Sequence, residues 1–203
     1  MHPLKAFFRN ARKPVGLAGR FMLWGMNCAH APLAAWGRSH LSPAPDARIL
    51  DIGCGGGANL AAFLELCPVS LVYGLDFSEE SVLHSREKNA AAIKAGRCEV
   101  TQGDVSAMPY ENDRFDIITA FETVYFWPDL SQTFREVRRV LKPSGTFLIC
   151  NDECNPQSRW LSLVEGMTVY DEPALRALLC GAGFTVASDA KGGRLCLMAQ
   201  KNG

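Results

Sequence analysis

The feature that most constrains this chain is a glycine-rich turn between an apolar run and a helical pattern. Ile49–Ile52 is a short run of branched apolar residues broken only by Asp51, and four glycines follow between Gly53 and Gly57. Glycine adopts the positive φ of a tight turn and lets a ligand approach the main chain closely. The pattern therefore predicts a strand, a tight turn and a helix start whose free N–H groups bind the polar end of a nucleotide-like ligand.

Strand-like and helix-like segments alternate over the rest of the chain. The expected strands are residues 48–53, 70–77, 99–103, 115–121, 146–151, 184–188 and 195–200, and the expected helices are residues 59–66, 78–95, 129–141 and 173–180. Strands separated by helices indicate a parallel sheet covered on both faces, and the last two strands, joined through Gly192 and Gly193, indicate an antiparallel pair. The sequence therefore predicts an α/β fold with a mostly parallel sheet of seven strands.

Residues 1–45 differ from this core in charge and in pattern. They carry six lysines and arginines and no acidic residue, whereas the whole chain of 203 residues has a formal net charge of zero. Prolines and glycines break their apolar residues into short pieces, and the Pro-rich stretch at 42–46 is typical of a linker. We predict an N-terminal helical lid at 1–45, with a solvated basic face, and a core domain at 46–203. A transit peptide, or a patch for nucleic acid or membrane, stays open as an alternative.

The cysteines and the hydropathy pattern bear on the compartment. Eight cysteines are scattered without any Cys-x-x-Cys pair, which is typical of reduced thiols in a cytoplasm. Cys150 and Cys154 lie near two acids, but because no histidine is close in sequence we predict no metal site. No apolar run reaches the roughly 18 residues of a membrane span. We therefore expect a cytoplasmic protein without a membrane span.

Acidic residues follow three of the expected strands, at Asp76, Asp104 and Glu122. Ligands of such sheets bind at the carboxyl ends of the strands, where the strand order reverses. Asp76 is placed to accept hydrogen bonds from the hydroxyls of a ribose. The glycine spacing from Gly53 also fits a dinucleotide fingerprint, so these residues alone leave an NAD-dependent dehydrogenase open.

Five motifs, taken in order, resemble those of class I S-adenosylmethionine-dependent methyltransferases, in the small-molecule branch similar to quinone-biosynthesis methyltransferases. The motifs are Leu50–Gly57, Gly74–Phe77, Gly103–Pro109, Phe115–Thr119 and Val140–Gly145, and they cover residues 47 to about 150. The resemblance implies a Rossmann-like fold with an antiparallel final strand, and S-adenosylmethionine as the cofactor.

The resemblance also implies roles for the residues at the strand ends. The glycines of the turn approach the methionine portion of the cofactor, and Asp76 holds the ribose diol. Phe77 and Val105 sandwich the adenine, and Asp104 binds its amino group. As ordinary structure, the two apolar residues would be core and the acids would be helix caps. The implied cofactor-binding residues are Asp51, Gly53, Cys54, Gly55, Gly57, Asp76, Phe77, Asp104, Val105 and Phe121.

The methyl acceptor is expected above the end of the fourth strand, beside the aromatic residues at 125–127. Methyl transfer from a sulfonium is an in-line displacement, so the protein mainly orients the nucleophile and excludes water. A general base is needed only if the nucleophile arrives protonated. We predict that Tyr125 and Trp127 wall the acceptor pocket while the residue between them seals the core. Tyr125, Glu122 and His30 are the candidate catalytic residues, His30 because a neutral imidazole accepts a proton near physiological pH.

The acceptor is expected to be a small molecule rather than a nucleic acid. The Asn/Asp-Pro-Pro-Tyr/Phe signature of nucleobase amino-methyltransferases is absent, since Phe121-Glu122-Thr123-Val124 stands in its place. A non-catalytic adenosine-cofactor sensor or assembly subunit with the same fold stays open, as does an NAD-dependent dehydrogenase. The sequence names neither the acceptor atom nor the oligomeric state.

Overall fold

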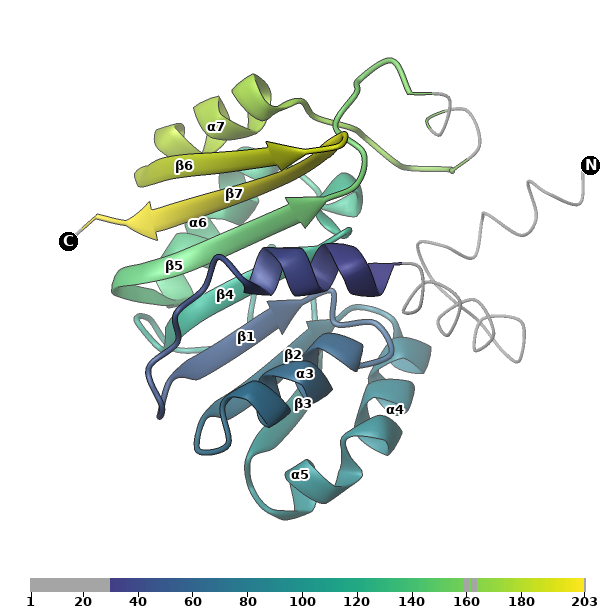
Figure 1. Ribbon diagram of the computed structural model, residues 1–203, viewed down its shortest axis with the longest axis vertical. Helices are drawn as coiled ribbons and strands as arrows, with labels where there is room; N and C mark the ends of the chain where they lie inside the picture. The colour runs from purple at the N-terminus through teal and green to yellow at the C-terminus, as the bar shows by residue number, and fades with distance from the viewer. Residues whose placement is uncertain (1–29, 159–160, 162–163, 203) are drawn as a thin grey trace, which may run out of the picture.

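A seven-stranded sheet forms the centre of the computed structural model, which describes residues 30–158, 161 and 164–202 (Figure 1). The strands are β1 (Arg48–Ile52), β2 (Leu71–Asp76), β3 (Cys98–Gln102), β4 (Phe115–Phe121), β5 (Leu141–Asn151), β6 (Phe184–Lys191) and β7 (Arg194–Lys201). Their order across the sheet is β3-β2-β1-β4-β5-β7-β6.

Five neighbouring strands, from β3 to β5, pair in parallel, and β7 runs antiparallel to both β5 and β6. This arrangement confirms the predicted α/β Rossmann-like fold with an antiparallel final strand. From β1, the strands β2 and β3 follow toward one edge of the sheet, and from β4 the strand β5 follows toward the other edge. The strand order therefore reverses between β1 and β4. Sheets of this kind bind their ligands at the carboxyl ends of the strands beside that point.

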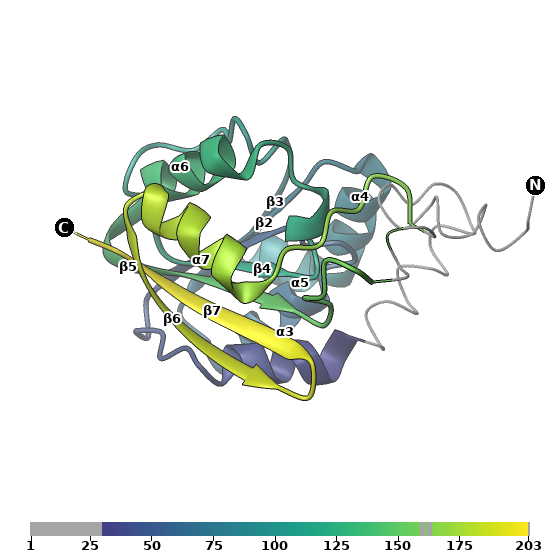
Figure 2. The same cartoon turned by 90° about the horizontal axis from the view of Figure 1, so that it is seen from above.

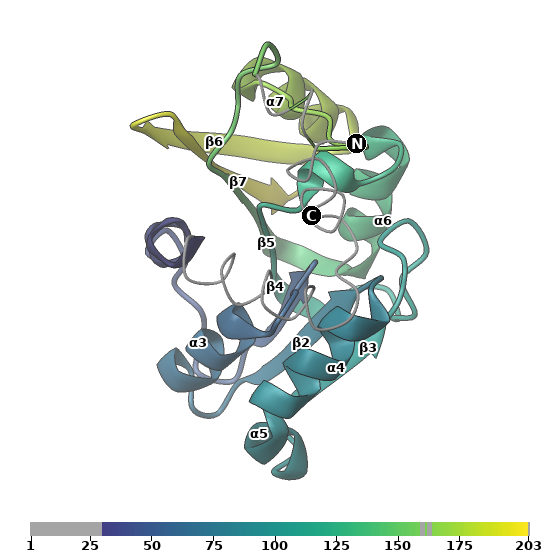
Figure 3. The ribbon, with the colours of Figure 1, turned by 90° about the vertical axis from the view of Figure 1, so that its right-hand side faces the viewer.

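Helices cover both faces of the sheet. They are a helix at residues 30–38, α3 (Ala58–Leu66), α4 (Glu79–Lys88), α5 (Ala90–Lys94), the 3-10 helix η1 (Val124–Phe126), α6 (Leu130–Val140) and α7 (Glu172–Gly181). Figures 2 and 3 show the helix at 30–38 and α3 on one side of the sheet, with α6 and α7 on the other. Two hydrophobic clusters fill these two interfaces. Val82 of α4 belongs to the cluster that holds α3, which places α4 on the side of α3.

The helix at 30–38 packs against the core. Its Leu33 is fully buried in the same cluster as Ile49 of β1 and Cys150 of β5. A Cβ at Gly37 would lie 2.7 Å from Phe121, so the helix backbone touches the sheet there. The apolar face of these residues therefore completes the core, while the division of the chain into a lid at 1–45 and a core at 46–203 stays a prediction. Residues 1–29 of the expected lid lie outside the described residues.

Two expected boundaries also differ from the structure. The single helix expected at 78–95 is divided at Asn89, whose buried side-chain amide donates to the carbonyls of Gly57 and Ser85. Such side-chain bonds to the backbone compete with helix continuation. The strand expected to begin at residue 146 begins at Leu141, because Leu141 already pairs with Phe115 before a shift in register.

No helix among residues 30–158, 161 and 164–202 is long and apolar enough to cross a membrane.

Candidate functional site

A cavity of about 380 Å³ opens at the carboxyl ends of β1, β2, β3 and β4. It lies over the point between β1 and β4 where the strand order reverses. The helix at 30–38 closes one side through His30, Ala34 and Arg38, and the turn after β4 closes another through Phe126 and Trp127. The topology thus gathers strand ends that are far apart in the sequence around one enclosed space.

The glycine turn after β1 forms the floor of this cavity. Gly53 and Gly55 have φ values of 72° and 51°, which glycine adopts without strain. The Gly53 N–H donates to the Leu75 carbonyl at 2.7 Å, and the Gly55 N–H donates to Asp76 Oδ2 at 2.9 Å. These bonds tie the turn to the end of β2 and leave its backbone facing the cavity, where Gly53, Cys54 and Gly55 all contribute to the lining.

Two acids lie at successive strand ends on the cavity wall. Asp76 is 8% exposed, and its Oδ1 accepts from the Ser78 N–H at 2.9 Å. Burial raises the pKa of Asp76, while hydrogen bonds from the Ser78 and Gly55 backbone oppose this shift. Asp104 accepts from the Ser106 hydroxyl and N–H, and these bonds lower its pKa. The wall therefore carries one sheltered acid and one exposed acid.

Three apolar side chains line the same cavity. Phe77 follows Asp76 and is 43% exposed, while Val105 follows Asp104 and is buried. Phe121, at the end of β4, lines the cavity as well. A large aromatic side chain at this exposure contributes no more than a partial core contact, so Phe77 offers a flat apolar face to the cavity.

Two of the expected ligand-binding residues lie behind the glycine turn and do not line the cavity. Asp51 is 1% exposed, and the Thr119 hydroxyl donates to it at 2.6 Å. Burial raises the pKa of Asp51 to about 7, while Thr119 and the charge of Arg38 oppose the shift. Gly57, with φ of 76°, faces the Ser85 and Asn89 side chains and lets α4 approach the start of α3.

The turn after β4 places its aromatic residues differently from the prediction. Phe126 and Trp127 line the cavity, whereas Tyr125 is 3% exposed and lies behind the lining. The prediction that Tyr125 walls the pocket and Phe126 seals the core is therefore wrong. It assumed the two-residue alternation of a strand, but η1 is a 3-10 helix, in which neighbouring side chains point about a third of a turn apart.

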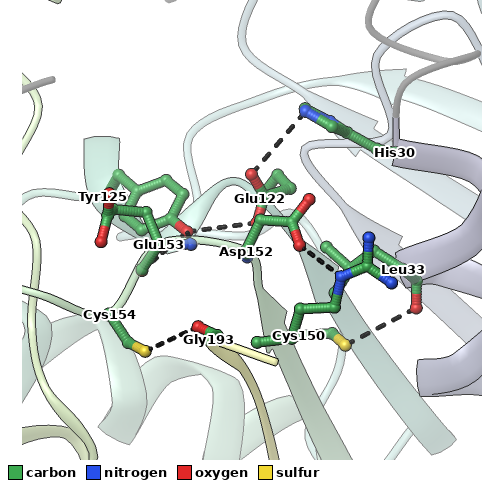
Figure 4. Close-up of polar contacts among 10 residues, drawn as sticks. His30, Leu33, Glu122, Tyr125, Cys150, Asp152, Glu153, Cys154 and Gly193 are labelled. Atoms are coloured by element: carbon green, nitrogen blue, oxygen red, sulfur yellow. Dashed lines mark hydrogen bonds and ion pairs between the residues drawn. The ribbon is translucent and has the colours of Figure 1, made fainter. Parts of the chain in front are cut away.

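Glu122 stands at the start of the turn that carries these aromatic side chains. Its backbone has φ of 59°, which is rare for a residue with a side chain. Its Oε1 accepts from the Asp152 N–H and from the Tyr125 hydroxyl, and its Oε2 lies 3.8 Å from His30 Nε2 (Figure 4). Burial raises the pKa of Glu122 to about 7. Burial also lowers the pKa of His30, with the charge of Asp152 opposing that shift.

Arg38, Asn59 and Thr123 line the cavity but do not stand out in the sequence. The Arg38 guanidinium donates to Asn59 Oδ1 at 2.7 Å, and Thr123 packs against Gly53. Arg38 is the last basic residue of the acid-free N-terminal segment, and this is the signal that singles it out in hindsight. Among the residues that the structure describes, no cluster of three or more His, Cys, Asp and Glu side chains is placed to hold a metal ion.

Comparison with known families finds a match that covers about half of the chain. Residues 50–149 match the family model described as "Methyltransferase domain". This range contains the glycine turn, the ends of β2 and β3, and all of β4. Residues 30–49 and the strands β6 and β7 lie outside the match.

Curated relatives are similar over a comparable range. Cycloartenol-C-24-methyltransferase 1 of Oryza sativa subsp. japonica is 32% identical over 105 residues, which cover 52% of this chain and 30% of the relative. The ubiquinone/menaquinone biosynthesis C-methyltransferase of Geotalea daltonii is 36% identical over 107 residues, covering 52% and 46%. An O-methyltransferase of Pyrenophora dematioidea is 27% identical over 155 residues, covering 73% and 58%. The chain spans less than two thirds of the length of each of these relatives.

Solved structures share the fold over most of the chain. A chain from the complex of the Haloferax volcanii Trm112 methyltransferase activator with a methyltransferase superposes with a TM-score of 0.82 at 21% identity, covering 90% of this chain and 93% of that one. Geranyl diphosphate C-methyltransferase from Streptomyces coelicolor superposes with a TM-score of 0.72 at 16% identity, covering 84% and 76%. At these identities the likeness is one of fold.

Proposed function

Because residues 50–149 are a methyltransferase domain of the class I, S-adenosylmethionine-dependent family, we propose that this protein transfers a methyl group from S-adenosylmethionine to a small-molecule acceptor. One observation carries the proposal. A single cavity joins Asp104, Asp76, the glycine turn and the aromatic turn, in the order in which β3, β2, β1 and β4 stand in the sheet. The relatives named as methyltransferases of quinones and sterols support a small molecule as the acceptor.

The residues present fit this cofactor along its length. Asp76 is sheltered and faces the cavity, as an acceptor for two vicinal ribose hydroxyls requires. Phe77 and Val105 lie at neighbouring strand ends, where they bracket a flat base, and Asp104 stands beside them as an acceptor for an amino group. Gly53 and Gly55 line the cavity with their backbone at positive φ, so the amino-acid portion can lie against the main chain there.

The amino-acid end of the cofactor is a zwitterion and therefore needs a cation in the cavity. Arg38 is the one lysine or arginine among the described residues that line it. The hydrogen bond to Asn59, in the helix that follows the glycine turn, orients the Arg38 guanidinium. Arginine binds carboxylates through two parallel N–H donors. We assign Arg38 to the α-carboxylate of the cofactor.

When bound, S-adenosylmethionine supplies a methyl group on a positively charged sulfur, which is already activated for displacement. The task of the chain is to hold the acceptor in line and to keep water away. The helix at 30–38 borders the cavity on one side, and we propose that it acts as a lid over the acceptor. We further propose that the protein acts in the cytoplasm as a catalyst, not as a sensor or assembly subunit.

Ligand-dependent thermal stabilisation tests the cofactor assignment. We expect S-adenosylhomocysteine to raise the melting temperature, and NAD to leave it unchanged. At about one hundred times the dissociation constant, the ligand adds roughly 2.7 kcal/mol to the free energy of unfolding. Stabilisation by NAD alone would support the dehydrogenase alternative. Stabilisation by S-adenosylhomocysteine without turnover on any acceptor would support the non-catalytic alternative.

The Asp76→Ala variant is expected to lose this stabilisation. The ribose hydroxyls would lose a charged acceptor, and a hydrogen bond to a charged group is worth about 1.5–3 kcal/mol. The melting temperature is measured without and with S-adenosylhomocysteine, so that any effect on the Gly55 turn appears in the ligand-free protein. The matched control is Glu111→Ala, an exposed acid outside the cavity. A full shift in Asp76→Ala would show that the ribose assignment is wrong.

The Arg38→Gln variant is expected to bind S-adenosylhomocysteine about 10- to 100-fold more weakly, from the same range for a charged hydrogen bond. Isothermal titration calorimetry measures the dissociation constant and so separates binding from any change in stability. Arg135→Gln, an exposed arginine outside the cavity, is the control. An unchanged dissociation constant in Arg38→Gln would refute the assignment to the carboxylate.

A further inference from the structure

We infer that Glu122 is the general base of the reaction and that the acceptor is a hydroxyarene, a flat aromatic molecule whose hydroxyl oxygen receives the methyl group. The inference rests on the proposed function and concerns the half of the cavity that the cofactor residues leave open. That half is bounded by the end of β4, by η1 and by the start of the helix at 30–38.

The two carboxylate oxygens of Glu122 have different surroundings (Figure 4). Oε1 accepts from the Asp152 N–H and lies 3.1 Å from the Tyr125 hydroxyl, whose single proton is shared with the Glu153 carbonyl at 2.9 Å. The Tyr125 hydroxyl is itself fixed, because it accepts from the Glu153 N–H at 2.9 Å. Oε2 is directed toward His30 on the cavity side. One oxygen thus anchors the side chain, and the other is available to a substrate, as a positioned base requires.

The backbone conformation of Glu122 supports a functional role for its side chain. A non-glycine residue at φ of 59° costs on the order of 1–3 kcal/mol, and the surrounding structure must hold it there. The Glu122 N–H donates to the Cys150 carbonyl at 3.0 Å, which fixes the turn at the end of β4. At this positive φ the chain leaves the direction of β4, and the Glu122 side chain lies in the cavity wall.

Charged and titratable groups face Glu122 from each element packed against it. His30 comes from the helix at 30–38 and Tyr125 from η1, and Asp152 and Glu153 follow β5. The Asp152 carboxylate is paired with Arg194 of β7 at 2.7 Å. Burial is the main reason that the pKa of Glu122 rises to about 7, and the charge of Asp152 adds to it. A carboxylate with this pKa is a stronger base than an exposed one and is still largely ionised slightly above neutral pH.

The walls beside Glu122 indicate the shape and chemistry of the acceptor. Phe121, Phe126 and Trp127 line the cavity, and aromatic side chains favour flat aromatic partners through stacked or edge contacts. A buried carboxylate beside them is matched by a ligand that donates a hydrogen bond, not by one that carries a negative charge. A neutral aryl hydroxyl stands on a flat aromatic ring and donates a hydrogen bond. Its pKa of about 10 is close enough to that of Glu122 for the carboxylate to accept its proton.

The proposed step is balanced as follows. Glu122 Oε2 takes the proton of the aryl hydroxyl while the hydroxyl oxygen forms a bond to the methyl carbon. The bond between that carbon and the sulfur breaks, and its electron pair stays on sulfur, which becomes a neutral thioether. The proton then leaves Glu122 for solvent on the side of His30, whose side chain is 32% exposed. Neither an oxidant nor a metal is required.

The test compares two phenols that differ in whether the hydroxyl is protonated at the pH of the assay. At about pH 8, 4-methoxyphenol is protonated, as its pKa is near that of a tyrosine, about 10, whereas 4-nitrophenol is ionised. We expect the wild-type protein to convert both to their methyl ethers, detected by mass spectrometry, and 4-nitrophenol the more slowly because its negative charge faces the Glu122 carboxylate. Glu122→Gln is expected to slow 4-methoxyphenol by about 10²–10⁴-fold, the usual contribution of a general base, and not to slow 4-nitrophenol, because that acceptor needs no base.

The pH profile and two further variants complete the test. Wild-type kcat for 4-methoxyphenol is expected to rise with pH through about 7, since Glu122 must be ionised to accept a proton. This rise of kcat with pH is expected to be absent in Glu122→Gln. It is expected to persist in Glu122→Asp, which keeps a carboxylate. Glu111→Gln, an exposed acid outside the cavity, is expected to match the wild-type rates.

Four outcomes would overturn the inference, and they are distinguishable from a failure of the proposed function. An equal loss on both phenols would assign Glu122 a structural role, and no loss on either would remove it from the reaction. A rise of kcat with pH that persists in Glu122→Gln would show that another residue is the base. A wild-type protein that is stabilised by S-adenosylhomocysteine but methylates neither phenol would exclude the acceptor class. An absence of that stabilisation, or of turnover on every other acceptor tried, would speak against the proposed function itself.

Discussion

Replacing Gly53 by alanine is expected to destabilise the protein by about 2–6 kcal/mol and to abolish cofactor binding. The φ of 72° at Gly53 costs a residue with a side chain on the order of 1–3 kcal/mol. In addition, the new Cβ would lie 2.2 Å from the Thr123 hydroxyl oxygen and 2.7 Å from Thr123 Cβ. Relieving such an overlap costs typically about 1–3 kcal/mol more. Because Thr123 belongs to the turn after β4, the relief would also move the cavity wall.

Gly96→Ala is the matched control for this experiment. Gly96 has nearly the same φ, 71°, but nothing lies within 4 Å of the position where its Cβ would stand. The control therefore carries the backbone strain without the overlap. Chemical denaturation gives the free energy of unfolding of both variants, and S-adenosylhomocysteine titration gives their affinities. Equal destabilisation by the two substitutions would show that the contact between Gly53 and Thr123 contributes nothing.

The second large effect is expected in the pH dependence of stability. Asp51 and Glu122 are buried carboxyls whose pKa values rise to about 7, from 3.8 and 4.5. Between about pH 4 and pH 7 the folded protein therefore keeps protons that the unfolded chain has released, and the free energy of unfolding falls as the pH rises. Above about pH 7 both states are ionised, and this contribution stays constant. The ligand-free protein is expected to be more stable at about pH 5 than at about pH 8.

The Asp51→Asn variant isolates one of these two carboxyls. A shift of about three pKa units corresponds to on the order of 4 kcal/mol, so we expect the variant to be more stable than the wild type at about pH 8 by up to this amount. At about pH 3 both side chains are neutral and the difference should vanish. The amide oxygen of asparagine still accepts from Thr119, so the packing is kept.

Denaturant titrations of the ligand-free proteins across this pH range measure the difference. Asp46→Asn, which replaces an exposed acid, serves as the control and should follow the wild type. If Asp51→Asn is less stable than the wild type at about pH 8, the carboxylate of Asp51 stabilises the fold in its charged form, and burial is not the dominant influence on it.

The prediction succeeded where the signal is local. The expected strand at 115–121 coincides with β4, and Ser78 caps α4 by accepting from the Ser81 N–H. Apolar periodicity and capping residues act within a few positions, so they can be read without knowing the fold. The same holds for the glycine turn, because the positive φ at Gly53 is a property of the residue type.

The prediction failed where a side chain's role depends on a distant partner. The break at Asn89 comes from a bond to Gly57, and Tyr125 is held behind the cavity lining by hydrogen bonds to Glu153. Arg38 was not singled out, because its place in the cavity follows from the packing of the helix at 30–38 on the sheet. Such contacts depend on strand order and helix packing, which no local pattern encodes.

By itself, the sequence determined the α/β fold, the glycine turn and the acids at the strand ends, because each follows from short-range periodicity and backbone preference. The tertiary structure alone decided which of these groups share a cavity. It placed Asp51 behind the turn and brought His30 and Glu122 within 3.8 Å across two separate elements. The physical reason is that burial and the order of the strands, rather than spacing along the chain, set the distances and the pKa values at this site.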